Sequence, residues 1–85
     1  MDIGLKRAEE LDPCHLRMAR AGLNLTVREL AVMSDMNKAT IVRIEAGLSV
    51  RASSLEAIRV ALETHGARFF ENPGEDGVLV SIVKS

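Results

Sequence analysis

The chain has 85 residues, of which 47% are hydrophobic and 27% are charged, and its formal net charge is −1 at pH 7. This length supports one domain with a modest hydrophobic core, near the size at which subunit association often adds stability. Phe69 and Phe70 are its only aromatic residues, which argues against recognition of single-stranded nucleic acid by base stacking. The balanced charge argues against a protein that coats DNA regardless of sequence.

Positive charge is concentrated in one part of the chain. Residues 13–51 carry six Lys/Arg and three Asp/Glu, a net charge of +3, whereas the remainder carries five and nine, a net charge of −4. A phosphate backbone responds to the charge it meets locally, so duplex DNA is a plausible partner whose binding should weaken as salt is added.

The sequence does not indicate a metal, cofactor or membrane site. Cys14 is the only cysteine, and although His15 follows it, no further Cys or His lies at metal-ligand spacing. We therefore expect no metal and no cofactor, and we expect Cys14 to be a packing residue of the first helix. No apolar run approaches the length of a membrane span and no signal peptide is visible, which predicts a cytoplasmic protein without membrane contact.

The first helix is predicted to begin at Asp12-Pro13, with Asp as the N-cap and Pro in the first helical position. Its inner face is formed by Leu16, Ala19 and Leu23. The preceding residues 1–12 suit either a short helix or a loosely docked arm, and their apolar positions are Ile3, Leu5, Ala8 and Leu11.

Two short helices are predicted in the centre of the chain. Thr26 and Glu29 have the spacing of a capping box at the start of the first one, and Asn37 can cap the second, which covers residues 38–46. The break between them, residues 34–36, is so short that the helices must cross steeply. In that arrangement one helix can enter a DNA major groove while the other braces it.

The second of these helices has two distinct faces. Ile41 and Ile44 are three residues apart and are expected to point inward. The outward stripe contains small and basic residues, which suits close approach to bases: Lys38, Ala39, Val42, Arg43 and Ala46. The alternative is an ordinary helical hairpin whose charged face is simply solvated.

The central stretch resembles the Cro/C1-type (XRE family) helix-turn-helix domain of phage repressors and small bacterial regulators, and the likeness covers about residues 13–66. The positions that match the family pattern are Thr26, Glu29, Leu30, Ala31, Ser34, Thr40, Ile41, Ile44, Glu45 and Gly47. Three positions depart from it: Asp35 replaces a turn Gly, Met36 a Val, and Val27 a Gln that often contacts phosphate. We expect a positive φ at Asp35, which Asp tolerates better than most residues.

The resemblance implies a role for each matching position. The residues in base-reading places are Lys38, Ala39, Thr40 and Arg43, although Lys38 could instead bind a phosphate. Those in phosphate-contacting places are Thr26, Asn37, Arg51 and Ser53, together with Arg28, which is equally well explained as a solvated surface residue. Arg20 and Glu45 are expected to form a shielded ion pair that holds the recognition helix in place.

A fourth helix is predicted after a loop that begins at Gly47, which is expected to close the recognition helix in the left-handed conformation. Ser53 is the expected N-cap, with Glu56 three positions later, and Gly66 ends the helix. Its buried stripe is Leu55, Ile58 and Leu62.

The chain ends in a predicted β-hairpin, with β-rich segments 67–71 and 78–83 around the turn-forming segment 72–77. The alternation places Leu79 and Val83 on the face opposite Val78, Val80 and Ile82. An isolated hairpin that is apolar on both faces is marginally stable and needs a partner surface. The simplest partner is the same hairpin of a second chain, so dimerisation is assigned to Phe69, Val78, Val80 and Ile82.

These patterns together predict a mainly α fold, a four-to-five-helix repressor-like DNA-binding domain with a C-terminal β-hairpin. Its parts are an N-terminal arm or short helix (1–12), the helix-turn-helix domain (13–66) and the hairpin (67–85). The predicted function is a homodimeric repressor that reads an inverted repeat in double-stranded DNA. The alternative is an antitoxin or antiactivator-like adaptor that binds a partner protein through the hairpin. An enzyme is not expected, because no nucleophile–base set, paired carboxylates or phosphate loop is visible.

Overall fold

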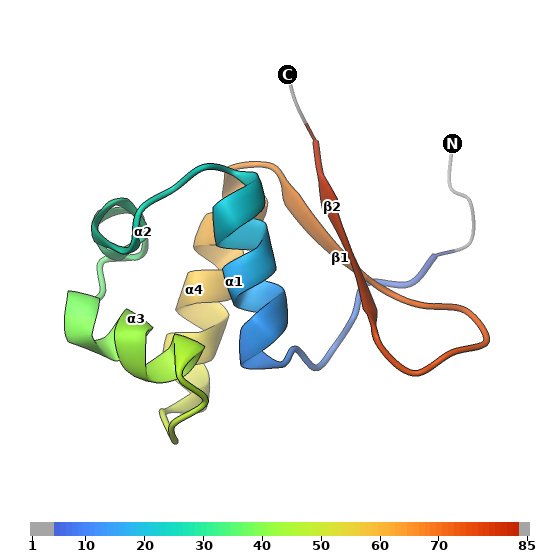
Figure 1. Ribbon diagram of the computed structural model, residues 1–85, viewed down its shortest axis with the longest axis horizontal. Helices are drawn as coiled ribbons and strands as arrows, with labels where there is room; N and C mark the ends of the chain where they lie inside the picture. The colour runs from blue at the N-terminus through green and yellow to red at the C-terminus, as the bar shows by residue number, and fades with distance from the viewer. Residues whose placement is uncertain (1–4, 84–85) are drawn as a thin grey trace.

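Four helices and one antiparallel β-hairpin make up residues 5–83, which are the residues that the computed structural model describes (Figure 1). In chain order the elements are α1 (Pro13–Gly22), α2 (Val27–Ser34), α3 (Lys38–Glu45), α4 (Ala52–Thr64), β1 (Ala67–Glu71) and β2 (Val78–Ile82). The predicted fold class, mainly helical with a terminal hairpin, is confirmed.

Local capping explains where the two central helices begin. The Thr26 hydroxyl accepts a hydrogen bond from the backbone N–H of Glu29 at 3.0 Å, and the Glu29 carboxylate accepts one from the N–H of Thr26 at 2.9 Å. The Asn37 side chain accepts from the N–H of Ala39 at 2.8 Å. Each cap satisfies backbone donors that have no partner within the helix.

The start of α4 differs from the prediction. The helix begins at Ala52 with Arg51 as its N-cap, and no side-chain hydrogen bond caps it. Ser53 therefore lies inside the first turn, and the expectation that it caps the helix is wrong. Backbone hydrogen bonds start the helix instead. The residue Arg51 is extended, and its carbonyl accepts from the N–H groups of Ser54 and Leu55 at 3.0 and 3.2 Å.

All four helices and β1 contribute to one core. Its largest side chains are each at most 2% exposed: Leu16, Leu30, Ile41, Ile44, Ile58, Leu62 and Phe69. Ala19 is 0% exposed, so α1 can approach its neighbours closely at this position. Cys14 does not belong to this core. It is exposed, because it lies two residues from Leu16 and therefore on nearly the opposite side of α1.

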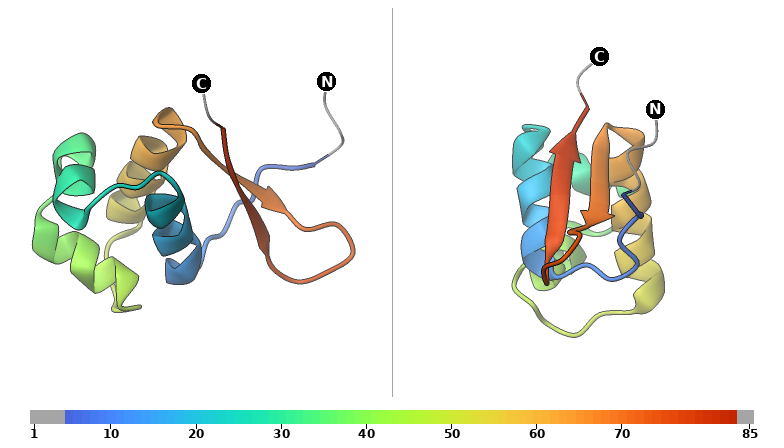
Figure 2. Two further views of the ribbon diagram at one scale, coloured as in Figure 1. Left: turned by 45° about the horizontal axis from the view of Figure 1, so that its top comes forward. Right: turned by 90° about the vertical axis from the view of Figure 1, so that its right-hand side faces the viewer.

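The N-terminal segment is neither a helix nor a loosely docked arm from residue 5 onward, while Ile3 lies outside the described residues. It runs extended beside β1, where the N–H of Ala8 donates to Phe69 O and the N–H of Glu71 donates to Lys6 O, both at 2.8 Å. Ala8 is 1% exposed. The segment therefore covers the edge of β1 that β2 leaves open (Figure 2, right).

The hairpin packs one face against its own helices. Phe69 pairs with Val80 and Ala67 pairs with Ile82 in the antiparallel register. Phe69 is 1% exposed, and Val78, Val80 and Ile82 are half-buried against the core. Gly22 at the end of α1 permits this contact, since a Cβ there would lie 2.8 Å from Cγ1 of Ile82. The partner surface that the hairpin needs is supplied by the same chain.

Candidate DNA interface

Helix α3 presents one face to the core and the other to solvent. Ile41 and Ile44 are each 1% exposed, which fixes the rotation of the helix about its axis. The five residues of the opposite face are all exposed: Lys38, Ala39, Val42, Arg43 and Ala46. Thr40, also expected to contact bases, is half-buried at the edge of this face. Helix α3 lies at the end of the molecule away from the hairpin (Figure 1).

The turn between α2 and α3 is short, and hydrogen bonds back to α2 hold it in place. Asp35 adopts the left-handed conformation, with φ 55°, as its place in the turn predicts. The N–H of Met36 donates to Ala31 O at 2.9 Å, and the Ser34 hydroxyl donates to Leu30 O at 2.7 Å. Met36 is half-buried against the core. These contacts hold α3 at a steep angle to α2.

A shielded ion pair joins α1 to the end of α3. Arg20 Nε and Nη2 donate to the two carboxylate oxygens of Glu45 at 2.6 and 2.9 Å, and Nη1 donates to Leu25 O at 3.0 Å. The two side chains are only 22% and 12% exposed. The hydrogen bonds to Glu45 raise the pKa of Arg20, against the opposing effect of burial. Arg20 thus connects the C-terminus of α3 to the loop before α2.

Arg43 lies in the last turn of α3 with its side chain exposed. Its Nη2 donates to Ser49 O at 3.4 Å, a long contact that leaves the guanidinium free to rearrange. Gly47 follows the helix with φ 80°, and the N–H of Leu48 donates to Arg43 O at 3.0 Å. The left-handed glycine ends α3 directly beyond the exposed face.

The residues expected to contact phosphates are spread along the loops and helix starts beside α3. Arg28, Arg51 and Ser53 are exposed and available. Thr26 and Asn37 already use their side-chain oxygens as caps, so only the hydroxyl hydrogen and the amide NH₂ remain as donors. The hydrogen bonds from Thr26 also lower the pKa of Glu29, which keeps a carboxylate at the start of α2.

A second cluster, which sequence reasoning missed, ties the N-terminal segment to α4. Arg7 Nε and Nη2 donate to the Glu63 carboxylate at 3.0 and 2.7 Å, and Arg59 Nε lies 3.5 Å from the same group. Arg59 is 4% exposed, lies over the Phe69 ring at 5.6 Å from its centroid, and donates to Glu9 O at 3.3 Å. The i,i+4 spacing of Arg59 and Glu63 could have indicated their ion pair from the sequence. The participation of Arg7 could not be predicted in this way, because Arg7 is distant in sequence from both.

The start of α1 brings together Asp12, Cys14 and His15, whose possible ligand atoms all lie within 4.8 Å of one another. His15 Nδ1 accepts a hydrogen bond from the N–H of Asp12 at 2.9 Å. This bond uses the Nδ1 lone pair, so the neutral ring carries its proton on Nε2. The imidazole acts here as part of a helix cap.

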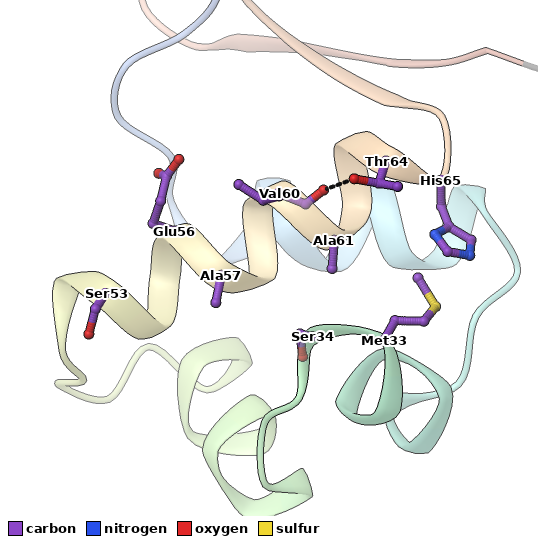
Figure 3. A pocket seen from close by; sticks show the side chains of 9 residues that line it. All are labelled: Met33, Ser34, Ser53, Glu56, Ala57, Val60, Ala61, Thr64 and His65. Carbon is purple, nitrogen blue, oxygen red and sulfur yellow. Dashed lines mark hydrogen bonds between the residues drawn. The ribbon is translucent and has the colours of Figure 1, made fainter.

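A shallow groove of about 440 Å³ lies between α2 and α4 (Figure 3). Met33 and Ser34 form its α2 side, and most of its α4 side consists of small or apolar residues. Glu56 and His65 are nine positions apart in sequence, which corresponds to about 13 Å along a helix axis. The Thr64 hydroxyl is engaged with Val60 O at 2.8 Å. The lining of the groove therefore brings together no acid–base pair.

Among the described residues, no helix is both long and apolar enough to cross a membrane.

A comparison with known proteins identifies a family with this arrangement of helices. No curated protein matches the chain. A helix-turn-helix family matches residues 16–68, which is more than half of the chain and includes α2, the turn and α3. The second helix of the matched motif is α3, which has a core-facing side and an exposed basic side. The chain belongs to the Cro/C1-type (XRE) helix-turn-helix family of DNA-binding regulators.

Proposed function

We propose that this protein is a homodimeric repressor that reads an inverted repeat in duplex DNA through α3. The observation that carries the proposal is the orientation of this helix. Ile41 and Ile44 hold one face in the core at 1% exposure, while Lys38 and Arg43 extend from the other. A helix held so firmly can place side chains against base edges with little loss of conformational entropy on binding.

Three side chains of the exposed face, and Thr40 at its edge, have a chemical role in the proposal. Arg43 contacts O6 and N7 of a guanine with two parallel hydrogen bonds, which discriminates against other bases by about 1–3 kcal/mol. Lys38 contacts either a base or a phosphate, and Ala39 leaves room for close approach. Thr40 contributes from the margin of the face. The charges and donors at Arg28, Arg51 and Ser53, with the remaining donors of Thr26 and Asn37, contact the sugar–phosphate backbone.

The proposed dimer uses the outer face of the hairpin. The residues first expected to form the interface face the protein's own core instead: Phe69, Val78, Val80 and Ile82. The outer face offers Leu79, which is 38% exposed, beside the half-buried Phe70 to which it is paired. Two such faces packed about a two-fold axis would leave both α3 helices clear of the contact. Operator half-sites are then expected about 10 bp apart, or a multiple of that spacing.

Arg43→Ala tests the DNA-binding part of the proposal. The variant and the wild type are compared by gel shift on the DNA upstream of the gene and on a scrambled duplex of equal length. We expect Arg43→Ala to lose about tenfold or more in affinity for the specific duplex and little for the scrambled one. Arg17→Ala removes a positive charge that is likewise exposed, on α1, and is the matched control. Equal effects of the two substitutions would contradict base reading by Arg43.

Leu79→Lys tests the dimer, because it places a charge at the centre of the proposed contact without touching the core. Light scattering is expected to give a dimer for the wild type and a monomer for the variant. Val60→Lys, at a valine that is 49% exposed on α4, is expected to remain dimeric. Removing residues 67–85 is a poorer test, since it deletes Phe69 from the core. A dimer that survives Leu79→Lys would refute this interface but not DNA binding by α3.

A further inference from the structure

We infer that Val42 reads the C5-methyl group of a thymine beside the base pair that Arg43 contacts. The inference rests on the proposed function of α3 as the base-reading helix, and it adds an apolar specificity contact to the polar ones already assigned. It concerns the one aliphatic branched side chain on the exposed face of this helix.

Val42 lies at the middle of that face. It is 50% exposed, with Lys38 and Ala39 one turn before it, Ala46 one turn after it and Arg43 beside it. All four neighbours are exposed, and the two alanines are too short to cover an isopropyl group. The two methyl groups of Val42 therefore project beyond the alanines, toward the surface that a major groove would meet.

The fold gives Val42 no packing role. It belongs neither to the buried core nor to the partly buried side chains packed against it, unlike Ile41 on the neighbouring face. A β-branched residue also has a lower helix propensity than alanine. A single exposed valine needs no explanation on most surfaces. Here, however, it lies between the two cationic side chains of a face proposed to enter the groove.

The major groove offers one apolar group that such a side chain can recognise. Thymine carries a C5-methyl group, whereas cytosine has only a hydrogen at that position and the purines present polar atoms. Because Val42 is adjacent to Arg43 on the exposed face, its side chain would meet a base pair next to the guanine that Arg43 is proposed to contact. Contact between the Val42 methyl groups and a thymine methyl would remove apolar surface from water on both sides.

The experiment begins with duplexes selected by the wild-type protein from a randomised pool, so that the operator need not be known. Each thymine of the best duplex is then replaced by deoxyuridine, which removes only the methyl group and leaves base pairing intact. Wild type, Val42→Ala and Val60→Ala are compared by fluorescence anisotropy on every duplex. Val60 is the matched control because it is a helical valine of almost equal exposure, 49% against 50%, on α4.

We expect a duplex with one deoxyuridine in each half-site to bind the wild type about 15-fold more weakly, because burial of one methyl-sized group corresponds to about fourfold and the proposed homodimer makes the contact twice. Val42→Ala should bind the thymine duplex about as weakly as wild type binds the deoxyuridine duplex, and should be insensitive to that replacement. Val60→Ala should behave as wild type. The inference is overturned if Val42→Ala keeps the full thymine-to-deoxyuridine ratio while Arg43→Ala still loses specificity. Failure of the wild type to select any sequence would instead overturn the proposed function.

Discussion

The Arg20–Glu45 ion pair allows a quantitative prediction, because the same chain contains a second pair of similar geometry and different burial. Arg20 and Glu45 form two hydrogen bonds at 2.6 and 2.9 Å, with side chains 22% and 12% exposed. Arg7 and Glu63 form two at 3.0 and 2.7 Å, but the Arg7 side chain is 54% exposed. The perturbations to compare are Arg20→Met and Arg7→Met, which keep most of each aliphatic stem.

The expected magnitudes follow from burial. Removing one partner of a fully buried pair costs roughly 3–5 kcal/mol, because the other charge is stranded, whereas exposed pairs contribute about 0–1 kcal/mol. The Arg20–Glu45 pair lies nearer the buried limit, and Arg20→Met also removes the hydrogen bond to Leu25 O. We expect this variant to lose about 2–3 kcal/mol of unfolding free energy, which lowers the melting temperature by roughly 10–20 °C in so small a domain. Arg7→Met should lose about 1 kcal/mol or less.

The assay is urea unfolding followed by far-UV circular dichroism, with the unfolding slope checked to be unchanged between variants. A double variant, Arg20→Met with Glu45→Leu, should recover part of the lost stability because it leaves no stranded charge. The reasoning is refuted if Arg7→Met destabilises the protein as much as Arg20→Met does. It is also refuted if the double variant is no more stable than Arg20→Met alone.

Two further predictions concern α4 and the hairpin. The pKa of Glu63 is lowered mainly by its hydrogen bonds from Arg7. This carboxylate should therefore contribute its full stability above its unfolded pKa of about 4.3, and that contribution should be lost as the pH falls through the lower folded pKa. The difference in unfolding free energy between wild type and Glu63→Gln should therefore be constant from pH 7 to about pH 5 and shrink below that, and a difference independent of pH down to pH 3 would contradict it. Gly22→Ala should destabilise the protein by about 1–3 kcal/mol, because the new Cβ would lie 2.8 Å from Cγ1 of Ile82. Ile82→Ala removes that atom, so urea unfolding should show Gly22→Ala to be less harmful in an Ile82→Ala background, and strict additivity would exclude the contact as the cause.

Much of the candidate interface could be predicted from the sequence because it depends on short-range interactions. The caps at Thr26 and Asn37 involve residues two or three positions apart. The left-handed conformation at Asp35 was expected from the resemblance, because the family has a glycine at this place in the turn. The two faces of α3 follow from helical periodicity alone. The Arg20–Glu45 pair was predicted from the family resemblance, since nothing local to either residue indicates its partner.

Contacts between distant segments were decided only by the tertiary structure. Alternation in the hairpin predicts that Val80 and Ile82 share a face. It does not predict whether that face packs against a second chain or against the protein's own helices. Likewise, no pattern in residues 5–8 indicates pairing with β1 more than 60 residues later. Local hydrogen-bonding and periodicity rules act over about one helical turn, whereas the choice of packing partner depends on the free energy of the whole assembled core. For this protein, the sequence by itself determined the helices and the exposed face of α3, and tertiary packing decided which surfaces remain free to bind.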